Sequence, residues 1–276
     1  MVGFRGKDFR STNHLVIENM NQSNKEVSMF VSLRTQPIKK GDHARRVGGH
    51  NSRSDPRMSN GADDTRTHLN QHLVKKADSI EQAINQMLDK HNVSPPKNSQ
   101  SVAQEIVLSA SPEYFRPGYD RNDPEGFGKY DPEKLEQWKE KSLEWLQKRY
   151  KGTLVDVQLH LDERTPHMHA VVVPIVNKYQ KKRRTKKEIE EGKEPETIVK
   201  KKWNRSAYFD RSKCYEMQES YGEALSELGL SRGIPKKVTK KNYKTTNDFK
   251  RESNSGANTQ KPAPKQRRRN TPSLNI

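Results

Sequence analysis

The 276-residue sequence predicts an α+β protein that contains at least one antiparallel hairpin. Two runs rich in β-branched and aliphatic residues, 154–159 and 170–173, flank a short polar connector with a proline, as in a hairpin. Three further segments, 78–90, 131–150 and 210–228, repeat apolar residues at helical spacing. Amphipathic helices combined with paired strands are typical of the α+β class.

Composition limits the size of the core and the classes of protein. The chain is 29% hydrophobic and 32% charged, so we expect a modest core and some unpacked chain. Its single cysteine, Cys214, excludes an internal disulfide framework and fits a reducing cytoplasm. No run reaches the length of a membrane span, and residues 1–28 lack the apolar core of a signal peptide. We therefore expect a cytoplasmic protein without membrane insertion.

The net charge of +18 is concentrated in two segments. Residues 178–202 hold eleven Lys/Arg against five Glu, and residues 231–276 hold thirteen Lys/Arg against two acidic residues. A nearly neutral body with basic segments favours a polyanionic partner, most simply nucleic acid, because phosphates release counterions when lysine and arginine bind them. A solvated tail that only aids solubility is the alternative for the second segment.

The N-terminal part predicts a strand followed by a loop. Residues 29–34 predict a first strand that ends at Pro37 and Gly41. The segment 43–53 is basic and interrupted by glycines, which predicts a loop where phosphate approaches the backbone.

The middle of the chain predicts two helices around a second strand. Residues 78–90 predict a helix capped by Asp78, and residues 104–109 predict a strand after a proline-containing linker. Asp131 and the following proline begin a helix over 131–150.

The C-terminal part predicts a basic insertion and a last helix. The insertion 178–202 is helix-prone around 186–191, and we expect it either to close over a bound DNA strand or to be a loose surface segment. Asp210 caps a helix that ends at Gly229.

The hairpin connector carries three histidines and a glutamate at H-x2-E-x3-H-x-H spacing: His160, Glu163, His167 and His169. A lone histidine on a strand is usually a bystander, but four such side chains within ten residues favour a metal site. Three convergent imidazoles with positions left for water describe a catalytic site, whereas structural zinc sites usually use cysteine. Glu163 is either a fourth ligand or a base beside the metal.

The two-residue period of a strand explains how the imidazoles meet. His167 and His169 project to one face together with Val171. On the preceding strand, residues 155, 157 and 159 share one face and residues 156, 158 and 160 share the other. His160 therefore joins the pair if the two strands are adjacent.

Several motifs resemble one known family. The string HLDERTPHMHAVVVP at 160–174 resembles the metal motif of the plasmid mobilisation relaxases of the Mob/Pre type. His50-Asn51-x-Arg53 resembles the family's N-terminal nucleophile motif, and RTHLN at 66–70 resembles its next short motif. The resemblance implies the central antiparallel sheet of the His-hydrophobic-His endonucleases.

The resemblance also implies a domain organisation. The relaxase catalytic domain spans 29–235 and includes the basic insertion 178–202. An N-terminal extension without an assigned role, 1–28, precedes it, and a basic tail, 236–276, is expected to be disordered.

The implied function is site- and strand-specific nicking of DNA at a plasmid's transfer origin, followed by rejoining of the strand. His50 is the implied nucleophile, which forms a covalent histidine–DNA intermediate, and Glu163 is the residue that holds it or acts as base. Arg53 and Arg66 are candidate ligands of DNA phosphates.

The implied cofactor and partners follow from the same resemblance. His160, His167 and His169 hold a divalent cation, Mn²⁺ or Mg²⁺ in the first place, although three imidazoles also suit zinc, cobalt or nickel. The implied partners are plasmid DNA at the transfer origin, single-stranded or as a hairpin, and the conjugation coupling machinery.

Two other functions remain as alternatives. A rolling-circle replication initiator shares the metal hairpin but attacks with a tyrosine, for which Tyr208 is the candidate. A non-catalytic DNA-binding protein uses only the basic segments. Within the histidine mechanism, His43 is the nearby rival of His50.

Overall fold

The computed structural model describes residues 29–55, 57, 61–119 and 129–234. The expected extension 1–28 and the expected basic tail 236–276 lie outside these residues. The elements described below belong to one unit of the chain, which ends at Gly233.

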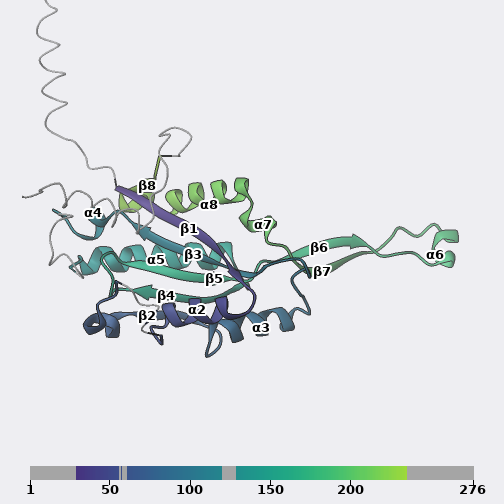
Figure 1. The fold of residues 1–276 in the computed structure, drawn as a ribbon. Coiled ribbons are helices and arrows are strands. Elements are labelled where there is room, and N and C mark those ends of the chain that lie inside the picture. Colours follow the sequence, from purple (N-terminus) through teal and green to yellow (C-terminus); the bar gives the residue numbers. More distant parts are fainter. Residues whose placement is uncertain (1–28, 56, 58–60, 120–128, 235–276) are drawn as a thin grey trace, which may run out of the picture. The chain divides into compact units, whose positions relative to one another are not determined.

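Among the described residues, six strands form a sheet in the order β2-β4-β5-β3-β1-β8, and two more form a separate ribbon, β6-β7 (Figure 1). All neighbours in the sheet are antiparallel except β1 and β8, which confirms the predicted α+β class with its antiparallel sheet. The strands are β1 (Met29–Lys39), β2 (Gln71–Lys75), β3 (Ser101–Ala110), β4 (Leu154–His160), β5 (His167–Val172), β6 (Ile175–Lys181), β7 (Thr197–Trp203) and β8 (Leu230–Arg232).

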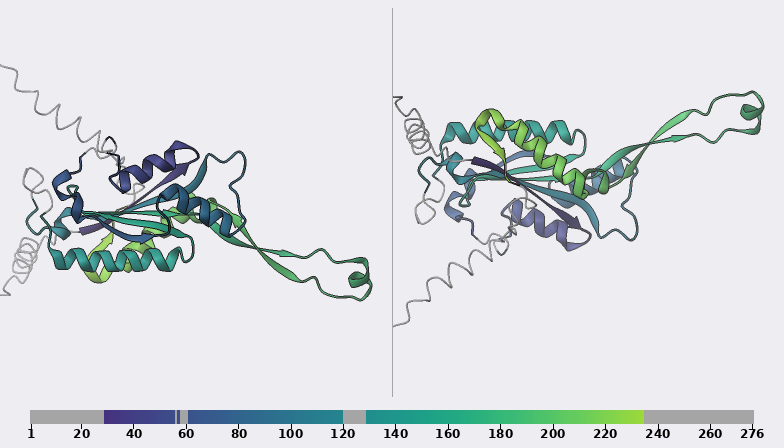
Figure 2. Two further views of the ribbon diagram at one scale, coloured as in Figure 1. Left: turned by 90° about the horizontal axis from the view of Figure 1, so that it is seen from below. Right: turned by 90° about the horizontal axis from the view of Figure 1, so that it is seen from above.

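Helices cover both faces of the sheet (Figure 2). One face packs against α5 and α8, and the other packs against α2 and α3. The helices are α2 (Asp42–Asn51), α3 (Ile80–Lys90), α4 (Pro112–Phe115), α5 (Pro132–Arg149), α6 (Lys186–Glu190), α7 (Ser206–Phe209) and α8 (Arg211–Ala224), with 3-10 turns η2 (Asp64–Leu69) and η4 (Ser226–Leu228). No helix among the described residues is long and apolar enough to span a membrane.

The two hydrophobic cores follow the two faces of β5. Met168 and Ala170 belong to the cluster with α5 and α8, whereas Val171 belongs to the cluster with α2 and α3. Because neighbouring residues of a strand point to opposite faces, His167 and His169 lie on the same side as Val171. The candidate metal hairpin therefore faces α2 and α3.

A bulge in β4 corrects the predicted alternation. Leu154 pairs with Val172 and Asp156 pairs with Val171, so Val155 is the extra residue. Val155 consequently joins the cluster with α2 and α3, whereas the prediction placed it on the opposite face. Beyond the bulge the alternation holds.

Residues 42–51 form a helix, and the prediction of a loop there was wrong. Ala44 and Val47 are buried on the face of α2 that meets α3. A Cβ at Gly48 would lie 3.7 Å from the Cβ of Ile80 on α3, which is an ordinary van der Waals contact, so the two helices pack together at this position. Gly48 and Gly49 therefore lie within a continuous helix and do not interrupt the chain.

Two predicted element boundaries shift. β1 continues to Lys39 through Pro37, which pairs with Gln104. The missing N–H of Pro37 disturbs no ladder there, because β8 pairs with β1 only at residues 29–31 and leaves the rest of that edge open. Ser79 caps α3 in place of the predicted Asp78, with its Oγ accepting from the Gln82 N–H at 3.1 Å.

Other boundaries agree with the prediction. Asp131 caps α5 and Asp210 caps α8, and Gly229 ends the last helical turn in the left-handed conformation at φ 72°.

The insertion 178–202 is an ordered ribbon with a short helix at its tip rather than a loose loop. The strands β2 and β8 had no predicted counterpart, because they are short edge strands of five and three residues.

Gly222 of α8 provides a test of the packing between α8 and β8. A Cβ at this position would lie 2.9 Å from the backbone nitrogen of Arg232. Replacing a helical glycine by alanine normally raises the free energy of unfolding by about 1 kcal/mol. Gly222→Ala should instead lower it, measured in urea, because the new methyl group would clash with the backbone of β8. Glu223→Ala, an exposed neighbour on the same helix, should change it by less than about 0.5 kcal/mol. Stabilisation by Gly222→Ala would contradict this contact.

Candidate active site

Four imidazole rings meet on the face of the sheet that carries α2 and α3. His160 at the end of β4 and His167 and His169 on β5 lie with ring centroids 4.7 to 5.1 Å apart. The antiparallel register places His160 directly opposite His167, as the strand period predicted. His50, in the last turn of α2, adds a fourth ring 5.7 Å from His160 and 5.2 Å from His169.

The side chains form two overlapping groups of ligand atoms. One atom each from His50, His160 and His169 lies within 4.8 Å of the others, and the same holds for His160, Glu163 and His167. His160 belongs to both groups and is fully buried. The predicted metal residues and the predicted nucleophile thus share one site.

A buried carboxylate orients His169. The Nδ1 atom of His169 lies 2.8 Å from Oε1 of Glu105, a residue of β3 that is 1% exposed. Burial alone would raise the pKa of Glu105, but hydrogen bonds from His169, Gln36 and Asn51 outweigh it and lower the pKa to about 2. The ionised carboxylate accepts a hydrogen bond from Nδ1, which leaves Nε2 on the other side of the ring. This Nε2 is buried and has no hydrogen-bond partner among the described residues.

Backbone carbonyls orient the other two imidazoles in the same way. Nε2 of His160 donates to the carbonyl of Asn51 at 2.8 Å, and Nδ1 of His167 donates to the carbonyl of Thr165 at 2.9 Å. Each ring therefore presents its second nitrogen as an acceptor to the cluster. Such contacts behind an imidazole fix its tautomer in metal sites.

Burial keeps these imidazoles neutral. Burial, followed by the nearby His169 and His167, lowers the pKa of His160 far below its usual range. Burial and the neighbouring His169 also lower the pKa of His167, to about 4. Glu163 is ionised, because the adjacent His167 and Arg53 outweigh burial and lower the pKa of its carboxyl. A cluster of imidazoles beside one carboxylate suits a divalent cation, and the partnerless Nε2 of His169 fits such an ion.

Arg53 occupies the centre of the polar network. Its guanidinium is 5% exposed and donates to both carboxylate oxygens of Asp162, at 2.8 and 2.9 Å. The Nη2 atom also donates to Oε1 of Glu163 at 2.7 Å and lies 3.0 Å from Nδ1 of His160. The Nη1 atom donates to the carbonyl of His50 at 3.1 Å. One side chain thus joins the end of α2 to the candidate metal hairpin.

Asp162 is the acceptor on which this network converges. It is completely buried and accepts from Thr67 at 3.1 Å and from Asn70 at 2.8 Å, in addition to Arg53. Asn70 also accepts from the N–H of Leu161 at 2.7 Å. The RTHLN segment therefore holds the connector of the hairpin in place. Arg66 lies in this segment on η2, one residue before Thr67.

The rival nucleophiles lie elsewhere. His43 stands two helical turns before His50, which corresponds to about 10 Å along α2. Its Nδ1 accepts from the N–H of Lys39 at 3.1 Å. Tyr208 packs with the cluster of α5 and α8, on the face of the sheet opposite the imidazoles, and its hydroxyl lies 3.4 Å from the carbonyl of Ile175.

The prediction from sequence did not include Asp162 or Glu105. A signal for Glu105 was present, since a lone glutamate inside the apolar run of β3 has to be paired when buried. Asp162 is next to Glu163 in the connector, but its role depends on Arg53, more than a hundred residues away in the sequence. Only tertiary structure reveals that contact.

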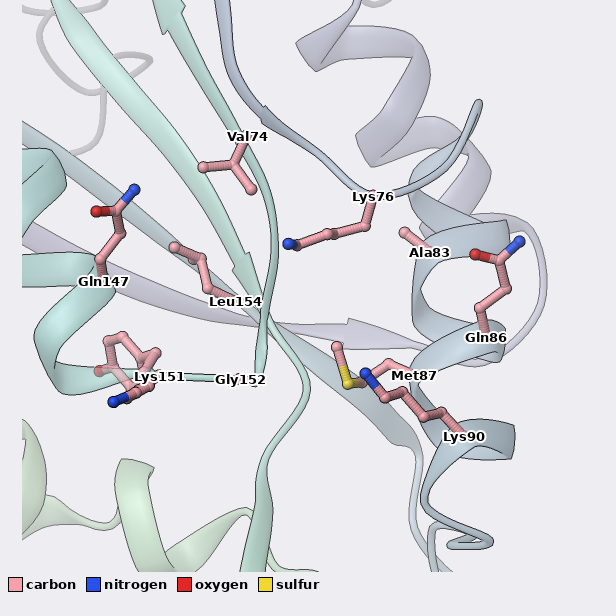
Figure 3. Close-up of a pocket in the computed structure, with 11 residues that line it drawn as sticks. Val74, Lys76, Ala83, Gln86, Met87, Lys90, Gln147, Lys151, Gly152 and Leu154 are labelled. Carbon is pink, nitrogen blue, oxygen red and sulfur yellow. The ribbon is translucent and has the colours of Figure 1, made fainter.

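A cavity on the β2 side of the domain is distinct from this site (Figure 3). It measures about 480 Å³ and is lined by Val74, Met87 and Leu154, with Lys76 and Lys90 at its side. None of its lining residues is a histidine or a carboxylate, so the chemistry described above has no counterpart there.

The fold and the site define a class of protein in which an antiparallel sheet presents clustered imidazoles and carboxylates beside a histidine from a separate helix. The model of the plasmid recombination enzyme (Mob/Pre) family matches residues 28–251, and the chain belongs to this family.

Curated relatives support the assignment. A plasmid recombination enzyme of Bacillus thuringiensis is 32% identical over 108 residues, which are 39% of this chain and 21% of that protein. A plasmid recombination enzyme type 3 of Staphylococcus aureus is 26% identical over 220 residues, which are 79% of this chain and 46% of that protein. A 65 kDa protein of Zymomonas mobilis is 27% identical over 183 residues, 64% of this chain and 26% of that protein. The chain thus spans less than half the length of these relatives.

Solved structures share the fold. The MobM relaxase domain, in a manganese-bound crystal structure with plasmid pMV158 oriT DNA, superposes with a TM-score of 0.55 at 24% identity. The match covers 81% of this chain and 98% of that domain. A second manganese-bound complex with a 22-nucleotide oriT DNA gives a TM-score of 0.56, also at 24% identity.

The pair of Arg53 and Asp162 should dominate the stability of the site. Asp162→Ala leaves the buried guanidinium without its main partner, so the free energy of unfolding should fall by about 3–5 kcal/mol. The matched control is Asp42→Ala, which removes an exposed pair with Arg45 on the same helix as His50 and should cost less than about 1 kcal/mol. Urea denaturation monitored by tryptophan fluorescence measures both. Equal losses in the two variants would show that Arg53 does not depend on Asp162.

Proposed function

We propose that this chain is a plasmid mobilisation relaxase, which nicks one DNA strand at a transfer origin through a covalent intermediate on His50 and then rejoins it. The observation that carries the proposal is the position of His50, whose ring contacts those of His160 and His169 although it comes from α2. The position of His50 beside a candidate metal site supports its role as the nucleophile. Family membership and the oriT complexes of the MobM domain support this choice of substrate.

His160, His167 and His169 would hold the cation, with Glu163 beside them. When bound, a divalent ion supplies positive charge to the non-bridging oxygens of the scissile phosphate and so lowers the barrier to attack. Manganese is present in the MobM relaxase structures, and Mn²⁺ or Mg²⁺ is the proposed ion for this chain.

The proposed reaction is a phosphoryl transfer to nitrogen. A ring nitrogen of His50 attacks phosphorus, and the bond from phosphorus to the 3′ oxygen breaks. The products are a free 3′-hydroxyl, once that oxygen takes up a proton, and a 5′-phosphate joined to His50 by a P–N bond. Rejoining reverses these steps without ATP, because the P–N adduct keeps the energy of the broken ester.

Arg53 acts in this proposal mainly as a positioning residue. Its donors are directed at Asp162, Glu163, His160 and the backbone of His50, which fixes the nucleophile relative to the hairpin. Oε1 of Glu163 accepts from Nη2 of Arg53 and lies 3.7 Å from Nε2 of His167. These contacts support a role for the carboxylate either as a metal ligand or as a base. Arg66 remains a proposed phosphate ligand.

The proposed catalytic domain covers 29–235 and includes the ribbon within 178–202. Plasmid DNA is the proposed partner, with the conjugation coupling machinery as a further one. Because plasmid DNA is the substrate, the cytoplasm is the proposed compartment.

The nicking reaction tests the role of His50. Supercoiled plasmid with the cognate transfer origin should be converted to open circles by the protein with Mn²⁺ and not with EDTA. His50→Ala should lower this rate at least about 1,000-fold, because the attacking atom is lost. Protease treatment should leave a peptide on the 5′ end of the wild-type product.

His43→Ala serves as the matched control on the same helix and should retain nicking within a few-fold. Tyr208→Phe addresses the replication-initiator alternative. Loss of the DNA adduct in Tyr208→Phe with its retention in His50→Ala would replace the histidine mechanism by the tyrosine one. Activity of the wild type in EDTA would remove the metal from the proposal.

Metal binding has an independent readout in thermal unfolding. Mn²⁺ at about 100 times its dissociation constant should add about 2.7 kcal/mol to the free energy of unfolding and raise Tm by several degrees. His169→Ala removes the partnerless Nε2 and should abolish most of this shift, whereas His43→Ala should keep it. An unchanged shift in His169→Ala would place the ion elsewhere.

A further inference from the structure

The ribbon β6-β7 projects from the domain as an ordered arm, which we define as residues 175–203 (Figures 1 and 2). Seven consecutive cross-strand pairs join the two strands, from Ile175 with Trp203 at the base to Lys181 with Thr197. At the tip, Thr185 and Glu188 form a capping box that begins α6. The arm therefore has a defined backbone.

The base of the arm is fixed to the core. Ile175 and Trp203 are 4% and 7% exposed and belong to the cluster of α2 and α3. The indole N–H of Trp203 donates to the carbonyl of Val102 at 3.0 Å, and the N–H of Asn204 donates to Pro174 at 2.7 Å. The direction of the arm is consequently set by the same sheet that holds the imidazoles.

Charges are divided between the shaft and the tip of the arm. The shaft, defined as residues 176–181 and 197–202, contains five lysines and no acidic residue. All five glutamates of the arm lie between 188 and 196. Two of them form ion pairs there, Glu191 with Lys193 at 2.7 Å and Glu196 with Lys182 at 3.4 Å. The shaft therefore carries a net charge of +5 and no negative charge.

The sequence of the shaft does not favour the ribbon by itself. Lys178 stands directly opposite Lys200, an arrangement of like charges that destabilises a two-stranded ribbon. Tyr179 and Val199 form the next pair and are 67% and 55% exposed. Isolated two-stranded ribbons are only marginally stable in water. Lys178 and Lys200 repel each other, and a bound anion would relieve this repulsion. The exposed Tyr179–Val199 pair beside them would lose contact with water in the same complex. Together these features indicate a binding surface for an anionic partner.

The shaft has two different faces. Strand alternation puts Lys178, Lys200 and Lys202 on one face. The other face carries Asn177, Tyr179, Thr197 and Val199, which are side chains of the kinds that contact base edges. Lys181 and Lys201 lie on the same face.

We propose that the shaft of the β6-β7 arm binds in the major groove of duplex DNA beside the nick site, with the Tyr179–Val199 face toward the bases. The major groove, about 12 Å wide, admits a two-stranded ribbon, and asparagine, threonine and apolar side chains contact base edges there. Seven residues of strand extend about 23 Å, which corresponds to about seven base pairs of duplex. Lysines on both faces reach the phosphates that line the groove. The proposal rests on the proposed DNA substrate, but it concerns a duplex segment separate from the nicked strand.

Equilibrium binding to a 20-base-pair duplex of arbitrary sequence in EDTA tests the proposal, by fluorescence anisotropy at several salt concentrations. The shaft variant Lys178→Gln/Lys200→Gln/Lys202→Gln should bind at least 10-fold more weakly at 100 mM salt. Its slope of log affinity against log salt should fall by about three. The matched variant Lys186→Gln/Lys187→Gln/Lys193→Gln removes the same charge at the tip and should stay within about 3-fold of wild type.

A second variant separates base contact from charge. Tyr179→Ser/Val199→Ser should weaken duplex binding severalfold and leave the salt slope unchanged. All substituted side chains are exposed, and an unchanged Tm establishes that each variant is folded. Equal losses in the shaft and tip variants would overturn the proposal, because binding would then follow net charge alone.

Two further measurements separate duplex binding by the arm from the nicking reaction and from binding to a lipid surface. The shaft variant should nick a single-stranded oligonucleotide with the cognate origin as fast as the wild type. If the wild type binds duplex DNA but never nicks, this result contradicts the proposed function and leaves the proposal for the arm intact. Co-sedimentation with phosphatidylserine vesicles tests a lipid partner. Loss of vesicle binding in the shaft variant without loss of duplex binding would assign the arm to a membrane surface and overturn the groove proposal.

Discussion

The buried ion pair between Arg53 and Asp162 is the constraint on which the site depends. Arg53 adopts a left-handed backbone conformation at φ 54°, which costs a residue with a side chain about 1–2 kcal/mol. This conformation turns the chain at the end of α2 so that the guanidinium points into the sheet. Because Asp162 is fully buried, neither partner is stable there without the other. The pair therefore ties the position of His50 to the position of the metal hairpin.

The packing around the end of α2 is the second requirement. Gly48 of α2 faces Ile80 of α3, and a Cβ at Gly49 would lie 3.2 Å from the Cβ of Asp55, a tight contact that glycine avoids. The segment after the helix therefore folds back over its last turn, and this fold brings Arg53 beneath His50. On the other side, β5 is buried on both faces, so the strand that carries His167 and His169 is packed from above and below. In the proposed function, a phosphate group would meet donors whose positions are set in advance, as electrostatic catalysis requires.

The two charged regions of the described chain have opposite physical properties. In the site, the carboxylates are buried or half-buried and each has a partner: Asp162 and Glu163 pair with Arg53, and Glu105 accepts a hydrogen bond from His169. On the shaft of the arm, the lysines are exposed and face no acidic neighbour. In the proposed function, the first arrangement fixes the geometry around one phosphate. In the proposed role of the arm, the second attracts many phosphates over a longer range, and this attraction weakens with salt.

The sequence by itself determined the local parts of this protein. The two-residue period of a strand placed His167 and His169 on one face, with His160 on the same face of the neighbouring strand. The aspartates before α5 and α8 correctly marked where those helices begin. Those features depend on neighbours in the chain, so a pattern reveals them. His50 was selected through the family motif alone, since periodicity does not distinguish it from His43. Tertiary structure decided that 42–51 is a helix, that Val155 is a bulge, that Asp162 and Glu105 support the site and that 178–202 is an ordered arm. These features arise from packing and from ion pairs between residues far apart in the chain. Their contribution to the free energy of folding depends on burial in the tertiary structure, which a local sequence pattern does not reveal.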